Sequence, residues 1–467
     1  MGKTQCVRRL LPAGIALLLL VVAGCGSGSS TTSGASTHAA ASSASTPSSP
    51  STPSSSSTGA REAVTLAVPS SMRGGELSDP HELSVPKGWK ASVWARPEGA
   101  RMLAITPEGN VLVSTPSNGA VIELSGGAEA EHEKIVLAGL ESPQGLAFGK
   151  RGSKEVLYVG ESDEIDAFPW RGGGKVGPQE VLAPDLPDEE PAGDDIHRQK
   201  DVVVGADGRI YFDLGSSSNA SPEDRTYDPP RGVIDSVGPE GGPVKVVMRG
   251  VRNGEGLALA PDGTVWTAIN DRDEIPYPFH GAYGGHDEAF GEVVPDYVDE
   301  HPVDEVVPVV QGRDLGWPLC NPEQGKNTPP GSLADVPLVP DSVTNPDGKA
   351  LDCASLAPIE VGIPAHSAPL GMSFLTGTKV PAPWSGGAVV AAHGSWDRQE
   401  PRSPAVLWMR WDAKQRTLEP AKVLVSGFQD EDGERWGRPV DVVPGPEGAL
   451  FVSDDTAGAI YKLTPPG

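Results

Sequence analysis

The stretch Lys200-Asp-Val-Val-Val-Gly-Ala-Asp-Gly-Arg-Ile-Tyr-Phe-Asp-Leu-Gly215 decides the fold of this chain. Two apolar runs, rich in β-branched and aromatic residues, flank an Asp-Gly turn in which glycine supplies the backbone angles that a tight turn needs. This pattern predicts a β-hairpin. Because a single hairpin cannot bury its own faces, the chain must supply further hairpins for it to pack against.

The same unit occurs six times in the chain. Its copies begin at Arg101, Pro143, Lys200, Gly254, Pro369 and Pro439. Apolar segments with a helical period are scarce, and 58 glycines and 47 prolines interrupt the chain, which favours an all-β fold. The repeats predict a six-bladed β-propeller of four-stranded antiparallel blades, because such sheets can pack radially around a central channel.

The N-terminus resembles a lipoprotein leader. Three cationic residues precede an apolar run from Leu10 to Ala23, which is too short for a membrane span. The run ends in Val22-Ala23-Gly24-Cys25, which resembles the bacterial lipobox. We therefore predict a signal peptide over residues 1–24 and lipidation of Cys25, with an ordinary secretory peptide as the alternative.

Composition divides the rest of the chain into a tether and one folded region. Residues 25–60 are almost entirely Ser, Thr, Ala, Gly and Pro, which predicts a disordered tether, and residues 61–467 form the expected propeller. The formal net charge of −26 argues against nucleic acid as a partner, because phosphates attract Lys and Arg. We expect an exported protein that touches the outer face of the cell membrane through its lipid anchor only.

Two cysteines are left for the folded region. Cys6 lies in the leader and Cys25 in the lipobox, so Cys320 and Cys353 are the remaining pair in a chain that leaves the cytoplasm. They fall in the longest gap between repeats, from about Pro276 to Pro364. We predict a disulfide between them within a loop elaboration; two buried free thiols are the alternative.

Polar residues beside the hairpins are the candidates for chemistry, because propeller sites lie where loops gather at one mouth of the channel. His197 precedes the third repeat and is a candidate general base, since imidazole titrates near neutral pH. Arg252, Arg398 and Arg438 can clamp carboxylates through paired hydrogen bonds. The acidic run from Asp271 to Glu274 offers oxygen ligands for calcium. The alternative for each of these residues is a structural hydrogen bond.

Several segments next to the hairpins carry a family signature. They include Arg252-Asn253-Gly-Glu-Gly-Leu-Ala, His366-Ser-Ala-Pro-Leu-Gly371, His393-Gly-Ser-Trp-Asp-Arg398 and Ser453-Asp-Asp455. From about Leu83 to Leu463 the chain resembles the glucose/sorbosone dehydrogenase family, soluble six-bladed propellers that use pyrroloquinoline quinone (PQQ) and calcium. The two histidine-led segments resemble the sorbosone dehydrogenase branch more than the glucose branch.

The resemblance implies a role for each site residue. His197 would take the hydroxyl proton while a hydride passes from the sugar carbon to the quinone. The residues expected to contact the cofactor are Gln144, Arg252, Asn253, Arg398 and Arg438. Calcium would lie near Asn270, Asp271 and Arg272, held partly by backbone carbonyls.

The predicted function is a PQQ- and calcium-dependent oxidoreductase of a sugar or sugar aldehyde, whose electron acceptor the sequence does not identify. The chain also departs from the glucose dehydrogenases. It has no Lys in the segment that ends at Arg398, Val440 in place of a second Arg, and no Gly-Pro in the calcium loop. These departures favour an alternative, a non-catalytic propeller lipoprotein that binds carbohydrate or protein. A propeller lactonase or esterase with a channel calcium is a third hypothesis.

Overall fold

The computed structural model describes residues 60–188, 197–324 and 333–466. The predicted signal peptide, the lipidated Cys25 and the tether up to residue 59 lie outside the described residues. Among the helices that the structure does describe, none is both long and apolar enough to span a membrane.

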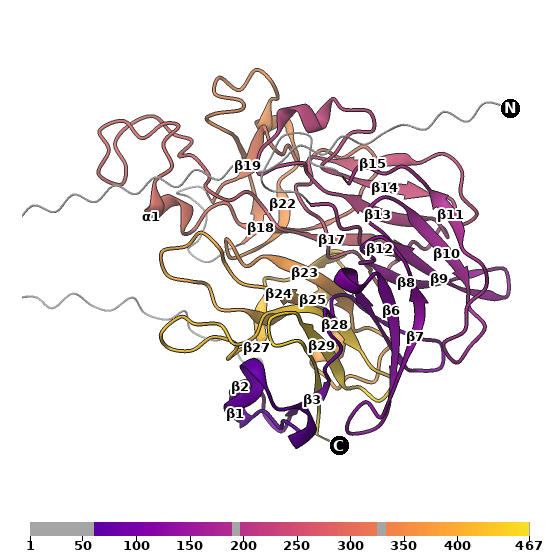
Figure 1. The fold of residues 1–467 in the computed structure, drawn as a ribbon. Coiled ribbons are helices and arrows are strands. Elements are labelled where there is room, and N and C mark those ends of the chain that lie inside the picture. Colours follow the sequence, from indigo (N-terminus) through magenta and orange to yellow (C-terminus); the bar gives the residue numbers. More distant parts are fainter. Residues whose placement is uncertain (1–59, 189–196, 325–332, 467) are drawn as a thin grey trace, which may run out of the picture. The chain divides into compact units, whose positions relative to one another are not determined.

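Six antiparallel sheets form the blades of a propeller (Figure 1). Blade 1 contains β4 (Leu103–Ile105), β5 (Val111–Thr115), β6 (Ala120–Ser125) and β7 (His132–Ala138). Blade 2 contains β8 (Leu146–Arg151), β9 (Lys154–Gly160), β10 (Ile165–Pro169) and β11 (Glu180–Ala183). Blade 3 contains β12 (Val202–Val204), β13 (Ile210–Leu214), β14 (Val233–Val237) and β15 (Lys245–Arg249).

The remaining blades have the same order, with extra strands in two of them. Blade 4 contains β16 (Ala258–Leu259), β17 (Val265–Ile269), β18 (Asp304–Pro308), β22 (Ile359–Ile363) and β20 (Ala334–Val336). Blade 5 contains β23 (Pro369–Phe374), β24 (Gly387–Ala392), β25 (Ala405–Asp412), β26 (Thr417–Leu418) and β27 (Lys422–Val425). Blade 6 contains β28 (Pro439–Pro444), β29 (Leu450–Asp454), β30 (Ala459–Thr464) and β3 (Lys90–Ala95).

The first strands of the six blades form a closed ring. Each contacts the first strand of the next blade in the order β4, β8, β12, β16, β23, β28, and β28 returns to β4. A central cavity of about 230 Å³ is lined by residues of all six of these strands. The prediction of an all-β, six-bladed propeller is therefore confirmed, and the six repeat units are the first two strands of the six blades.

The two ends of the described chain meet in blade 6. β3 is the only strand of this blade from the N-terminal side, and it pairs with β30, as its indigo ribbon beside the yellow C-terminal strands shows (Figure 1). Before it, β1 (Arg61–Thr65) and β2 (Glu82–Pro86) form a separate two-stranded sheet. The pairing of β3 with β30 fastens the ring, because the last blade is complete only when both ends of the chain are in place.

The longest gap between repeats holds more structure than a loop. It supplies β18 and β22, the third and fourth strands of blade 4, and between them an insertion with its own sheet of β19 (Cys320–Pro322) and β21 (Leu338–Pro340). Cys320 and Cys353 form the predicted disulfide within this insertion, with their Cα atoms 5.8 Å apart. Blades 4 and 5 thus depart from the four-stranded pattern because inserted segments add β20 and β26 at their outer parts.

Buried aspartates join neighbouring blades near the channel. Asp441 of blade 6 accepts hydrogen bonds from the backbone N–H groups of Leu103 in blade 1, at 2.8 Å, and of Val442, at 2.7 Å. Asp201 makes the equivalent bond from blade 3 to Leu257, next to β16, at 2.8 Å. Burial raises the pKa of Asp441 to about 7. These carboxyl groups satisfy backbone donors that the inner strands leave unpaired.

Candidate functional site

The site lies at the end of the channel opposite the hairpin turns. In each inner hairpin, the residues before the first strand and after the second strand meet at this end, which we call the mouth. A cavity of about 490 Å³ lies there. Its lining consists of Arg101, His197, Asn219, Arg252, Asn253, Glu255, Asn270, Asp273, Ala368, Leu370, His393 and Trp396.

His197 lines this cavity with its side chain almost fully buried. Its Nδ1 lies 2.9 Å from the hydroxyl oxygen of Ser216, and that hydroxyl donates its one hydrogen to the carbonyl of Ser218 at 2.8 Å. The Ser216 oxygen can then accept a hydrogen bond from Nδ1–H, as in the tautomer whose lone pair is on Nε2. This tautomer is the one that a general base needs when Nε2 is the reacting atom.

Arg252 is held in the wall by a network from two blades. Its guanidinium forms an ion pair with Asp273 at 3.0 Å and donates to the carbonyl of Asn270 at 3.2 Å. Oδ1 of Asn219 accepts a hydrogen bond from the backbone N–H of Asp273 at 2.9 Å, and the Asn219 amide donates one to the backbone carbonyl of Asp273 at 2.8 Å. Arg252 is 1% exposed, so its position is fixed before any ligand arrives.

Asn253 and Glu255 form a second polar group in the wall. The Asn253 amide donates to Glu255 at 3.1 Å, and Gln144 donates to the other oxygen of Glu255 at 2.9 Å. Oδ1 of Asn253 is buried and has no hydrogen-bond partner among the described residues. A buried acceptor without a donor is costly, and a donor on a bound ligand would remove that cost.

His393 and Arg101 meet at a third part of the lining through Asp455. Nε2 of His393 lies 2.9 Å from one oxygen of Asp455, and Arg101 lies 2.7 Å from the other. Burial alone would raise the pKa of Asp455, but its bond with His393 and the positive charge of Arg101 outweigh burial and lower the pKa below its ordinary range. Burial lowers the pKa of His393, although its bond to Asp455 acts in the opposite direction.

Trp396 and Arg438 form the rim. Trp396 is 73% exposed although it lines the cavity, and the Arg438 guanidinium lies 4.5 Å from its ring centroid. Arg438 also donates to the carbonyls of His393, at 2.8 Å, and Gly394, at 3.1 Å. The cation therefore supports one aromatic face and the loop that carries it.

The predicted cofactor contacts divide into two groups. Arg252 and Asn253 line the cavity, whereas Gln144 lies behind it and Arg438 beneath its rim. Arg398 points elsewhere, since its guanidinium binds the carbonyl of Asp299 and the carboxylate of Glu300.

The three residues predicted to mark the calcium site also separate. Asn270 lines the cavity. Asp271 turns inward, where burial raises the pKa of its carboxyl group well above the ordinary value. Arg272 forms an ion pair with Asp341 of the insertion. Asp273, one residue further on, brings its carboxylate to the lining instead.

Asp273 also belongs to a cluster with His366 and Asp397. Nε2 of His366 lies 2.7 Å from the carbonyl of Val298, and its Nδ1 lies 3.0 Å from Asp397. Burial alone would lower the pKa of His366, but the bond to Asp273 and the charge of Asp397 outweigh it and raise the pKa to about 9. An imidazolium thus already provides the positive charge in this cluster.

Sequence reasoning missed part of the lining. Arg101, Asn219, Glu255 and His393 were not among the candidates, and neither was Trp396. His393 and Trp396 lie within the segment that ends at Arg398, and Arg101 is the first residue of the first repeat. Testing every polar or aromatic residue of these repeats and segments as a candidate would have found them.

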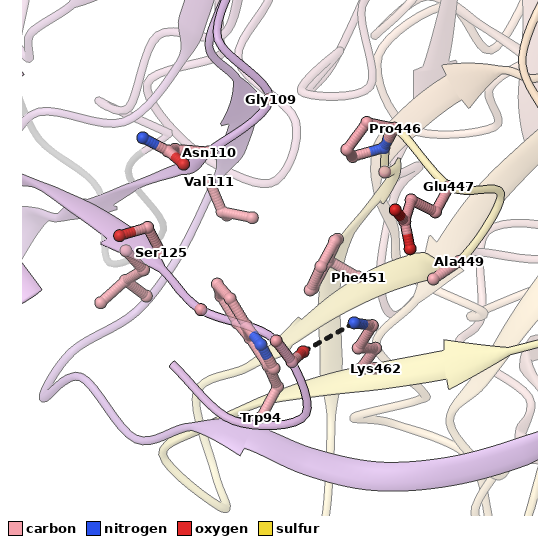
Figure 2. A pocket seen from close by; sticks show the side chains of 14 residues that line it. Trp94, Gly109, Asn110, Val111, Ser125, Pro446, Glu447, Ala449, Phe451 and Lys462 are labelled. Atoms are coloured by element: carbon pink, nitrogen blue, oxygen red, sulfur yellow. Dashed lines mark hydrogen bonds between the residues drawn. The ribbon is translucent and has the colours of Figure 1, made fainter. Parts of the chain in front are cut away.

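A further cavity, of about 230 Å³, lies between blades 1 and 6 at the end where the hairpin turns are (Figure 2). Figure 2 shows Trp94 and Phe451 on its walls and Lys462 bonded to a backbone oxygen, which is that of Gly127 at 2.8 Å. It is smaller than the mouth cavity and contains no imidazole or guanidinium group among its described lining residues. The mouth cavity, by contrast, brings together the imidazole of His197 and the guanidinium groups of Arg101 and Arg252, and we take it as the candidate site.

The chain is similar to known proteins over most of its length. The PQQ domain of pyranose dehydrogenase from Coprinopsis cinerea is 16% identical, with a TM-score of 0.66, over 86% of this chain and 100% of that one. A calcium structure of a family AA12 carbohydrate-active enzyme from Trichoderma reesei is 18% identical, with a TM-score of 0.64, over 81% and 96%. At these identities the likeness shows the fold.

Two further comparisons concern sequence. A protein of Borreliella burgdorferi described as uncharacterized is 35% identical over 101 residues, which span 22% of this chain and 27% of that protein. A family model described as TrAA12-like matches residues 83–466. The predicted family is thereby confirmed, while its sorbosone branch stays a prediction. The chain belongs to the TrAA12-like family.

Proposed function

We propose that this protein is an oxidoreductase that oxidises a sugar or sugar aldehyde, with PQQ and calcium bound in the mouth cavity and His197 as the general base. The observation that carries the proposal is the position of His197. Its ring lines a cavity of about 490 Å³, and its Nδ1 lies 2.9 Å from the hydroxyl oxygen of Ser216. Arg252 and Asn253 line the same cavity and are held by buried hydrogen bonds. The volume falls in the range of about 300–1,000 Å³ that is usual for small-molecule sites.

The lining suits a planar polycarboxylate such as PQQ. The guanidinium groups of Arg101 and Arg252 can bind carboxylates or quinone oxygens. The orphaned Oδ1 of Asn253 requires a donor, which a ligand N–H or a sugar hydroxyl would supply.

Calcium would complete the charge balance. Arg252 is paired with Asp273 and Arg101 with Asp455, so the wall has little net positive charge to offset three ligand carboxylates. The carboxylate of Asp273 and the oxygen atoms of Asn270 are the candidates for holding the ion, because calcium prefers oxygen ligands. When bound, PQQ would supply a hydride acceptor, and calcium would polarise its carbonyl group.

The residues of the chain would then perform the acid–base and positioning work. Nε2 of His197 would take the proton from the sugar hydroxyl, and the Ser216 hydroxyl would stabilise the resulting imidazolium by keeping Nδ1–H engaged. Trp396 has one face on Arg438 and is otherwise largely exposed. Its ring would offer an apolar platform for the C–H face of a sugar ring.

Reconstitution tests the proposal. Protein lacking residues 1–59 would be titrated with PQQ in the presence of calcium, and activity would be measured with aldoses, sorbosone and sugar alcohols using an artificial electron acceptor. We expect saturable PQQ binding and sugar-dependent turnover. The Asn253→Asp variant should bind PQQ more weakly, because it adds a negative charge where the anion lies. Sugar binding without PQQ binding would favour the non-catalytic propeller instead, and lactone hydrolysis without PQQ would favour the lactonase.

We also propose, from the leader alone, that the protein is exported and lipid-anchored at Cys25. The full-length chain should partition with membranes, and the Cys25→Ala variant should be found in the soluble fraction. A Cys25→Ala protein that still partitions with membranes would contradict the lipid anchor.

A further inference from the structure

A second group of acidic side chains lies in blade 2, outside the mouth cavity. Glu161 and Glu164 belong to the loop between β9 and β10, and Asp166 is the second residue of β10. One carboxylate oxygen from each lies within 4.8 Å of the other two. We propose that these three residues bind a calcium ion, separate from the calcium of the proposed function.

The spacing of the three oxygens suits calcium. Calcium binds oxygen ligands at about 2.4 Å, so two ligands of one ion can be up to about 4.8 Å apart. Small side-chain movements would place one calcium ion among the three carboxylates.

Two oxygens in the cluster point to a missing ligand. Oε1 of Glu161 and Oδ1 of Asp166 are buried without a hydrogen-bond partner among the described residues. The two residues are 2% and 0% exposed, so these atoms are shielded from bulk solvent. A buried carboxylate oxygen without a donor or cation is strongly unfavourable. A bound cation removes this cost at both atoms together.

The charge around the cluster supports the same conclusion. Asp163 lies next to these carboxylates in the sequence, so four acidic residues fall within residues 161–166. Gln179 donates to Glu164 at 2.9 Å and to Asp166 at 2.5 Å but carries no charge. The ammonium group of Lys200 acts on the adjacent Asp163 and is itself held by the carbonyls of Pro187 and Arg198. A divalent cation would supply the charge that these contacts lack.

The cluster is connected to the mouth through the loop before β8. The second carboxylate oxygen of Glu161 accepts the backbone N–H of Glu141, and the carbonyl of Glu141 accepts from Ser162 at 2.9 Å. Three residues later, the N–H of Gln144 binds the carbonyl of Gly160 at 2.8 Å. A calcium ion at the cluster would therefore stiffen the loop that places Gln144 against Glu255.

Calorimetric titration of calcium into chelator-treated, PQQ-free protein tests this site. The variant is Glu161→Gln with Asp166→Asn, which keeps the side-chain shapes and removes two ligand charges. The matched control is Glu131→Gln with Glu133→Gln, which removes the same charge from an exposed part of blade 1. We expect wild type and control to bind one more calcium ion per chain than the variant. The unfolding temperature of wild type and control should also rise by more on calcium addition than that of the variant.

Equal stoichiometry and equal calcium-induced shifts in all three proteins would overturn the proposal. The absence of calorimetric binding in wild type would also overturn it, and a shared proton would then hold the carboxylates together. Should the double variant not fold, Glu164→Gln, which removes a partly exposed ligand, replaces it, with calcium affinity expected to fall about tenfold. Because the titration contains no PQQ, its failure is distinguishable from a failure of the proposed function.

Discussion

The inner ring and the mouth of this propeller both bury polar groups, but the two regions differ in whether those groups have hydrogen-bond partners. In the ring, both oxygens of Asp441 accept backbone N–H groups, one of them from the next blade. At the mouth, Oδ1 of Asn253 has no partner among the described residues. The satisfied carboxylate of Asp441 thus holds two blades together, whereas the orphaned oxygen of Asn253 belongs to a residue that lines the candidate site.

The acidic cluster of blade 2 follows the pattern of the mouth. Its buried oxygens on Glu161 and Asp166 also lack hydrogen-bond partners among the described residues. In this respect the cluster resembles Asn253 more than Asp441.

The largest expected effect is at the mouth. The His197→Ala variant should lose activity with PQQ and sugar by about 10²–10⁴-fold, because a positioned base contributes a factor of that size. Its unfolding temperature should change little. The control is His393→Gln, whose ring bonds to Asp455 and which we expect to alter substrate affinity more than turnover. Steady-state kinetics and thermal unfolding of both variants measure this. Wild-type turnover by the His197→Ala enzyme would contradict the role of His197 as the general base.

The next effect is expected in the ring. The Asp441→Ala variant leaves the N–H groups of Leu103 and Val442 unpaired, and the unfolding free energy should fall by about 2–4 kcal/mol. Asp441→Asn retains one accepting oxygen and should lose less. Denaturant titration compares the two. If Asp441→Ala were as stable as wild type, the aspartates would not be joining the blades.

The smallest effect concerns His366, which lies between the two regions. Its pKa is raised from 6.5 to about 9 in the folded protein, so its contribution to stability is full below pH 6.5 and is lost as the pH rises through about 9. His366→Gln should lower the unfolding free energy by about 2 kcal/mol at pH 6.5 and by little at pH 10. Denaturant titrations at both pH values check this. A difference that does not depend on pH would show that the ring is not an imidazolium.

The fold could be predicted because its signal is local and repeated. Each inner hairpin carries its own turn, such as the one in which Gly208 adopts a positive φ of 78°, and six copies require radial packing. The disulfide could be predicted because only Cys320 and Cys353 were left to pair. The extra strands β20 and β26 could not, since short edge strands depend on contacts with the rest of their blade rather than on their own pattern.

The site was predictable only where a residue lies next to a hairpin. His197, Arg252 and Asn253 lie a few residues before inner strands and line the cavity. Arg272 and Arg398 have the right chemistry, but their ion pairs are with Asp341 of the insertion and with Glu300, just before β18, and the sequence does not reveal the path of either segment. Glu161 and Asp166 gave no signal, because a cluster formed by a loop and its following strand is visible only after folding.

The most direct test of the central claim is an anaerobic single-turnover experiment with no other electron acceptor present. Protein loaded with PQQ and calcium would be mixed with one equivalent of sugar, and the absorbance of the bound quinone would be followed. The account predicts that one equivalent of a reactive sugar reduces one equivalent of quinone. Bound quinone that stays oxidised with every sugar tested would contradict it.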